Sequence, residues 1–152
     1  MLNEFKLPMA AEGLIPHRLP MRQIDRLVEY HEGEEATVEA VIDAANPLLD
    51  GDGQLSEVAL VEMLAQAFAA VQGYADRLAG KPVGQGFLVG ISKVVMEGTA
   101  HVGDCLSIRI RPIAAVERFV VVEGEVFLGQ QPLAAGKLKL WIPQGEVTPE
   151  KA

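Results

Sequence analysis

The chain has few of the residues on which metal, redox and disulfide chemistry depend. Cys105 is the single cysteine among 152 residues, which excludes an internal disulfide and is typical of a reducing compartment such as the cytoplasm. The three histidines, His17, His31 and His101, are far apart in sequence. No set of His, Cys, Asp and Glu has metal-ligand spacing, and no glycine-rich phosphate loop is present. The sequence therefore predicts no metal and no cofactor.

Positive charge is also scarce. With 13 Lys and Arg against 21 Asp and Glu, the formal net charge is −8, so we expect no partner among nucleic acids or anionic membranes, which demand clustered basic residues. Residues 1–10, MLNEFKLPMA, lack an apolar run behind a basic start, so no signal peptide is predicted. The longest apolar run is short for a bilayer and contains Glu62, so no membrane span is predicted. We therefore expect a cytoplasmic protein.

That apolar run, residues 55–78, predicts one long helix. Its apolar residues recur at helical spacing, and alanine, the best helix former, is abundant. Ser56 can cap the first turn, and Glu57 follows where the helix dipole favours a negative charge. Only Glu62 and Gln66 are strongly polar in its middle, and they lie one turn apart on one face. A helix so apolar is expected to be buried on nearly every side.

The rest of the chain predicts strands. Alternating or valine-rich runs bounded by turn residues lie at 22–32, 36–42, 87–96, 106–111, 119–128 and 137–142. Pro112 is expected to end the fourth of these strands. Short connections between consecutive strands favour an antiparallel sheet. Because one sheet cannot cover every side of the helix, we expect another layer or another subunit to cover the remainder.

These elements predict one α+β domain over residues 1–152. An antiparallel sheet of about five to six strands would wrap around one long central helix, with the core between residues 15 and 143. The lead-in, residues 1–14, and the polar tail, residues 144–152, are expected to be weakly ordered.

Three segments carry recognisable motifs: IPHRLPMRQIDRL (15–27), VEMLAQ (61–66) and FLVGISKVVMEGTAHVGDCL (87–106). Together they resemble the hotdog-fold dehydratases of the FabA/FabZ type, which act on 3-hydroxyacyl-acyl-carrier-protein. Residues 15–27, IPHRLPMRQIDRL, resemble the family's L-P-H-R-x-P-…-D-R motif. Residues 61–66, VEMLAQ, resemble E-A-x-A-Q, whose acidic residue is catalytic in the family, and residues 87–106 resemble a strand with G-I-x-K-…-P-G-D. The resemblance implies a hotdog fold, an acyl thioester carried by acyl carrier protein or coenzyme A as substrate, and a homodimer or higher oligomer.

One family motif is missing. The family's base is a histidine in a G-H-F-P-G loop ahead of the helix, whereas this chain reads Gly51-Asp52-Gly53-Gln54, with Asp52 in the histidine's place. The sequence is most similar to divergent dehydratase-like proteins, such as those of aryl polyene gene clusters. Those proteins share a P-H-x-x-P-M motif and also lack the loop.

Dehydration of a 3-hydroxyacyl thioester needs a base for the C2 proton, an acid for the departing hydroxyl and a donor that polarises the thioester carbonyl. The resemblance assigns the acid to Glu62, which Gln66 could orient. His17 or Asp52 could be the base; alternatively, His17 fixes its loop through a backbone carbonyl and Asp52 is exposed in a turn. Backbone amides near Ser56, at the helix start, could polarise the carbonyl.

Other candidate residues concern contacts. Gly90, in the matched strand, is assigned to substrate binding by the resemblance. Arg18, Arg22 and Arg26 form a basic cluster on an acidic chain. Arg18 and Arg22 could contact an acidic carrier protein or its phosphopantetheine phosphate; alternatively, they are ordinary solvated charges.

Two alternatives to a dehydratase remain open. The protein could be a non-catalytic partner that binds acyl chains or pairs with an active dehydratase, as the missing loop histidine suggests. It could also be a hotdog thioesterase, in which a helix carboxylate acts as base or nucleophile.

Overall fold

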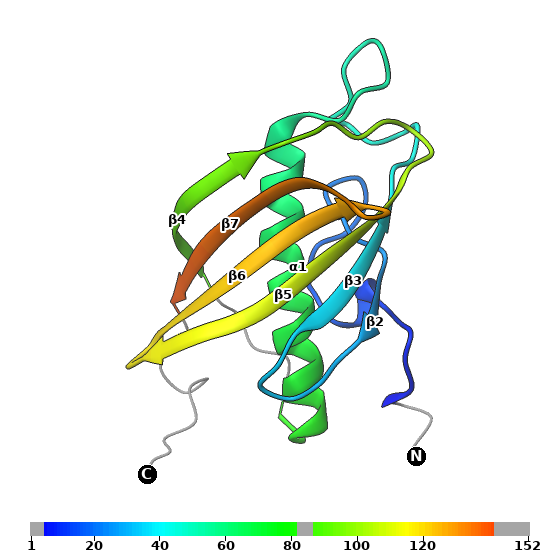
Figure 1. Ribbon diagram of the computed structural model, residues 1–152. Coiled ribbons are helices and arrows are strands. Elements are labelled where there is room, and N and C mark those ends of the chain that lie inside the picture. Colours follow the sequence, from blue (N-terminus) through cyan, green and yellow to red (C-terminus); the bar gives the residue numbers. More distant parts are fainter. Residues whose placement is uncertain (1–4, 82–86, 142–152) are drawn as a thin grey trace.

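The protein is described from a computed structural model, in which residues 5–81 and 87–141 are placed (Figure 1). Within these ranges one long helix, α1 (Glu57–Leu78), lies against a seven-strand antiparallel sheet. The strands are β1 (Met9–Ala10), β2 (Arg26–Glu29), β3 (Ala36–Val41), β4 (Phe87–Met96), β5 (Cys105–Val116), β6 (Phe119–Leu128) and β7 (Gln131–Trp141), and a 3-10 turn, η2, covers Ala11–Gly13. The predicted α+β architecture, a sheet around a central helix, is confirmed.

Helix α1 begins where the sequence predicts. Ser56 is its N-cap, and its Oγ accepts the backbone N–H of Val58 at 3.1 Å. Its buried apolar side chains belong to the core; they are Ala59, Leu60, Met63, Leu64, Ala67, Phe68, Ala70 and Tyr74. The helix is long and apolar enough to cross a bilayer, but 56% of its apolar window is buried inside the molecule, as in the core helix of a globular fold. It is less enclosed than expected, because Val58 is exposed.

The sheet order is β1-β2-β3-β5-β6-β7-β4. Strand β4 follows the helix in sequence but pairs with β7, at the opposite end of the sheet from β1 (Figure 1). The sheet has seven strands, not the predicted five to six, because β1 was not predicted. Met9 and Ala10 pair with Leu27 and Arg26 and add a strand that is too short for any alternation to reveal.

The lead-in also belongs to the core more than expected. Ala11 and Leu14 are fully buried, and the backbone N–H of Ala11 donates to the carbonyl of Asp25 at 2.9 Å. A short apolar stretch without periodicity, such as this lead-in, predicts a weakly ordered terminus. Burial of Ala11 and Leu14 in the core orders it instead. Residues 1–4 and the predicted tail lie outside the described residues.

Three strand limits differ from the predictions. Strand β7 begins at Gln131 instead of residue 137. Strand β2 covers only Arg26–Glu29, because residues before it run across the helix instead of along the sheet. Strand β5 continues past Pro112 to Val116, through a register shift between Pro112 and Ala114. A bulge accommodates a residue that has no N–H to donate, so the proline bends the strand without ending it.

Candidate active site

A segment that precedes β2 carries the matched P-H-R-L-P motif across the helix. We call residues 15–25 the crossing segment. It is attached to α1 by Gln66, whose side chain is buried: Oε1 accepts the backbone N–H of Gln23 at 2.7 Å, and Nε2 donates to the carbonyl of Met21 at 3.0 Å. The same Nε2 donates to Oε2 of Glu62 at 2.7 Å, from one turn away on the helix. The predicted pairing of Gln66 with Glu62 is thus present in the structure.

The crossing segment places His17 beside Glu62. His17 Nε2 lies 3.9 Å from Glu62 Oε2, with 37% and 42% of the two side chains exposed. This separation is too long for a direct hydrogen bond but leaves both groups open to a substrate or a bridging water. Among the described residues His17 Nδ1 has no hydrogen-bond partner. Within the part of the chain that the structure describes, the imidazole therefore makes no hydrogen bond to a backbone carbonyl through Nδ1, and Nε2 is the ring nitrogen that lies near the carboxylate.

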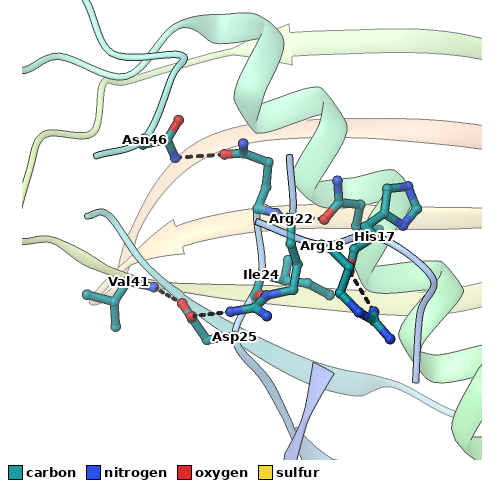
Figure 2. A network of polar contacts seen from close by, with 9 residues as sticks. His17, Arg18, Arg22, Ile24, Asp25, Val41 and Asn46 are labelled. Atoms are coloured by element: carbon teal, nitrogen blue, oxygen red, sulfur yellow. Dashed lines mark hydrogen bonds and ion pairs between the residues drawn. The ribbon is translucent and has the colours of Figure 1, made fainter. Parts of the chain in front are cut away.

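Side-chain contacts on the other flank hold the crossing segment in place (Figure 2). Asn46 Nδ2 donates to Gln23 Oε1 at 2.8 Å, which attaches the segment to the loop ahead of α1. Asp25 Oδ2 accepts the backbone N–H of Val41 at 2.6 Å, and Arg22 Nε donates to the carbonyl of Ile24 at 3.0 Å. No sequence pattern revealed the contacts of Asn46 with Gln23 and of Val41 with Asp25, because each joins residues that only the fold brings together, whereas the contact of Arg22 with Ile24 is local.

Asp52 and Ser56 do not reach Glu62. Asp52 is exposed in a turn, where its N–H donates to Oδ1 of Asp50 at 2.8 Å. The backbone N–H of Gln54, which also donates to Asp50 Oδ1, and after it that of Asp52 lower the pKa of the Asp50 carboxyl. At the helix start, the amide of Ser56 donates to Leu48 and the amide of Val58 to the Ser56 hydroxyl. These amides already have partners, so the structure offers no support for their predicted role on a thioester carbonyl.

Gly90 and the arginines lie in different places. Gly90 is in β4 opposite Lys139. Arg18 is exposed, and its NH1 donates to the carbonyls of Ile15 and His17 at 2.9 Å each. Arg22 is turned inward, with only 16% of its side chain exposed and Asp25 at 3.8 Å. The three arginines do not form a continuous basic patch, since Arg26 pairs with Glu39 at 2.8 Å.

Comparisons with known proteins agree with this arrangement. The ApeP-like family, described as ApeP dehydratase, matches residues 9–150. The chain is 31% identical over 140 residues to the 3-hydroxyacyl-[acyl-carrier-protein] dehydratase FabZ of Natranaerobius thermophilus, covering 90% of this chain and 93% of that one. It is 29% identical to the FabZ of Oceanobacillus iheyensis, covering 74% and 86% of the two chains.

Solved structures share the fold. The dehydratase heterocomplex ApeI:P from Xenorhabdus doucetiae superimposes with a TM-score of 0.82 at 22% identity, covering 90% of this chain and 93% of that one. The phenylacetic acid degradation protein PaaI from Thermus thermophilus gives a TM-score of 0.59 at 16% identity, covering 76% and 90%. The hotdog fold and the resemblance to FabZ-type dehydratases are therefore confirmed, and the chain belongs to the ApeP-like dehydratase family.

Proposed function

We propose that the protein removes water from 3-hydroxyacyl thioesters carried by acyl carrier protein or coenzyme A, in fatty-acid or polyene-type biosynthesis. The observation that supports this activity most directly is the approach of His17 Nε2 to Glu62 Oε2 at 3.9 Å, with both groups partly exposed. The relatives named as 3-hydroxyacyl-[acyl-carrier-protein] dehydratases support the substrate class. The single cysteine is compatible with our proposal of a reducing cytoplasm.

The pair suits the chemistry because the two reacting groups of the substrate are neighbours. His17, as neutral imidazole, takes the proton from C2, and Glu62, as carboxylic acid, gives a proton to the hydroxyl on C3. The hydroxyl leaves as water, a double bond forms between C2 and C3, and the thioester stays intact. Transfer of the proton from the His17 imidazolium to the Glu62 carboxylate returns both groups to their starting protonation states. The two groups are close, so the proton has only a short distance to travel.

Gln66 is a positioning residue in this proposal. Its amide donates to Glu62 and also holds the backbone of the crossing segment, so the distance between His17 and Glu62 depends on it. A contact of Arg18 with a carrier protein remains a prediction. For Arg22 the inward orientation favours a structural role instead.

The test is mass-spectrometric detection of water loss from 3-hydroxyacyl thioesters on a carrier protein. Glu62→Gln is expected to slow turnover about 100-fold or more, because the amide cannot donate the proton. Glu57→Gln is the matched control: it lies on the same helix, is exposed, and is expected to keep the wild-type rate. Wild-type turnover by Glu62→Gln would refute the assignment. Released thiol in the same assay would reveal a thioesterase.

A second role, as a partner of another hotdog chain, is favoured by the surface of β4. Val89, Ile91, Val94 and Val95 are exposed along this end strand of the sheet, and its outer edge has no partner strand within the described ranges. We propose that a second chain, either a copy or a different hotdog protein, covers this edge in a homodimer or larger assembly. No water loss by the protein alone, with turnover restored by a co-purified hotdog chain, would support the non-catalytic alternative.

A further inference from the structure

The side chain of Asn46 attaches the loop between β3 and α1 to the crossing segment (Figure 2). Asn46 Nδ2 donates to Gln23 Oε1 at 2.8 Å. Gln23 is only 4% exposed, and its buried Nε2 has no hydrogen-bond partner among the described residues. Within the ranges that the structure describes, Asn46 is therefore the only hydrogen-bond partner of the Gln23 side chain.

Asn46 is itself held at the start of α1. Its Oδ1 accepts the backbone N–H of Leu48 at 2.8 Å, and the carbonyl of Leu48 accepts the backbone N–H of Ser56, the N-cap of the helix, at 2.9 Å. An Asn side chain that binds the backbone two residues further on fixes the shape of a turn. The Nδ2 donor of Asn46 therefore has a defined position relative to the helix that carries Glu62.

The contact of Asn46 with Gln23 continues to Glu62 through Gln66. The backbone N–H of Gln23 donates to Gln66 Oε1, and Gln66 Nε2 donates to Glu62 Oε2, at 2.7 Å each. Because a side-chain amide is planar, a shift of the Gln23 backbone that turns the Gln66 amide also moves the donor that holds Glu62. Three hydrogen bonds in succession therefore connect Asn46 to the Glu62 carboxylate.

Neither His17 nor Glu62 is held in place by its own burial. Their side chains are 37% and 42% exposed, and the 3.9 Å between Nε2 and Oε2 is too long for a direct hydrogen bond. Their separation therefore depends on where the crossing segment lies over α1. That segment is held over the helix by Gln66 and, through the Gln23 side chain, by Asn46.

Loss of the Asn46 donor would leave the Gln23 side-chain amide buried and unpaired. An unpaired buried carbonyl oxygen is unfavourable, and the strain is relieved when the crossing segment moves outward and water reaches the amide. Such a movement takes the backbone N–H of Gln23 away from Gln66. The reacting pair then loses its spacing, although neither His17 nor Glu62 has been changed.

We propose that Asn46 is a positioning residue that sets the placement of Glu62 relative to His17, an inference that rests on the proposed function. It acts through the Gln23 side chain and the Gln66 amide, and it does not touch substrate. Removal of the C2 proton and protonation of the C3 hydroxyl require both groups in place at once. A displacement of about 1 Å therefore slows the reaction far more than it weakens substrate binding.

The kinetics of two matched variants test this role. Asn46→Ser keeps an oxygen that can accept the Leu48 N–H but is too short to reach Gln23. It is expected to lower kcat for water loss about tenfold and to change KM by less than about twofold. Asp43→Ser is the control, because Asp43 Oδ1 accepts the backbone N–H of Ala45 within the same loop, and it is expected to keep the wild-type kcat. Circular dichroism confirms that both variants are folded. A wild-type kcat in Asn46→Ser would overturn the inference.

A double-mutant cycle and a rescue separate positioning from a general loss of structure. Gln23→Met keeps the backbone N–H and removes the acceptor of Asn46, so Asn46→Ser combined with Gln23→Met is expected to be no slower than the slower single variant. Asn46→Asp is expected to recover kcat to within about threefold of the wild type, because the Gln23 amide can turn over and donate its unpaired Nε2 to the carboxylate. Multiplied effects in the double variant, or no recovery by Asn46→Asp, would overturn the inference.

NMR measures the placement without turnover and keeps the two hypotheses apart. The side-chain amide signal of Gln66 in the ¹⁵N-labelled protein is expected to shift in Asn46→Ser and to stay in place in Asp43→Ser. A shifted Gln66 signal in a protein whose wild type removes no water would refute the proposed dehydration but keep the placement by Asn46. Water loss by the wild type, with an unmoved Gln66 signal and an unchanged kcat in Asn46→Ser, would do the reverse.

Discussion

A single amide side chain, that of Gln66, connects the helix to the segment that carries His17. It makes three hydrogen bonds, to the backbone of Met21 and Gln23 and to the carboxylate of Glu62, and it is buried while it does so. When the side chain that binds a buried backbone group is removed, that group loses its hydrogen bond and has no water molecule to replace it. The local structure of the site therefore depends on a residue that need not touch substrate.

Replacement of this residue tests that dependence. Gln66→Leu is expected to lower the free energy of unfolding by about 2–4 kcal/mol, because two backbone groups of the crossing segment lose their partners. Gln72→Leu is the control on the same helix: it removes one hydrogen bond, to Asp76, and is expected to cost about 1 kcal/mol or less. Urea denaturation of both variants measures the difference. Equal losses would contradict the bridging role of Gln66.

Cys105 allows a test of local electrostatics with one reactive group. Cys105 is an exposed residue, but partial desolvation of its thiol, and after it the carboxylate of Glu39, raises the pKa of the thiol above its ordinary value. The unfolded chain therefore releases the thiol proton at a lower pH than the folded chain, so this group favours unfolding as the pH rises past the ordinary thiol pKa. Alkylation of Cys105 with iodoacetamide is expected to show a higher midpoint pH in the folded protein than in urea. A lower midpoint in the folded protein would contradict this.

Among the elements, the contact between helix α1 and strand β6 depends on a residue without a side chain. A Cβ added to Gly124 would lie 2.7 Å from Leu64 Cδ2 and 3.1 Å from Ile110 Cδ1. Leu64 and Ile110 are both in the core, so neither can move freely. Glycine at this position lets the helix lie close to the sheet.

A one-methyl change tests this packing. Gly124→Ala is expected to lower the free energy of unfolding by about 1–3 kcal/mol, because the core must shift to admit the methyl group. Gly51→Ala is the control, since a Cβ there meets no atom within 4 Å. Thermal or urea denaturation compares the two. A neutral Gly124→Ala variant would show that the helix and sheet separate more easily than the contacts imply.

For the whole molecule, the open edge at β4 determines what can assemble with it. Strand β4 ends the sheet, and its exposed valines would otherwise remain in water. The bulges between Leu88 and Gly90 and between Ser92 and Val95 twist this edge and restrict which strand can pair with it. A partner with a matching edge, such as another hotdog chain, would satisfy both its polar backbone and its apolar side chains.

A charge placed on that edge tests the assembly. Val95→Lys is expected to convert a dimer into monomers in light scattering, because burying an unpaired ammonium group in the contact is unfavourable. Val116→Lys, at the exposed far end of β5, is the control and is expected to leave the mass unchanged. If Val95→Lys keeps the mass of the wild type, the partner covers a different surface.

Part of the site could be predicted from sequence because its residues lie in short, recognisable motifs. Glu62 and Gln66 share one helical face, and His17 lies in a motif between two prolines. The bond of Gln23 to Asn46 could not be predicted, since their pairing depends on how the crossing segment meets the loop before α1. The inward orientation of the Arg22 side chain could not be predicted for the same reason. The presence of an arginine in the sequence does not show which way its side chain points.

The long capped helix, the antiparallel strands and the family could be inferred from the order of residues alone, because these depend on local periodicity, capping and short motifs. That Met9–Ala10 is a strand, that Pro112 lies within β5 and that His17 lies beside Glu62 became visible only in the folded chain. Those features depend on contacts between residues far apart in the chain, and such contacts form only when burial of the core brings distant segments together.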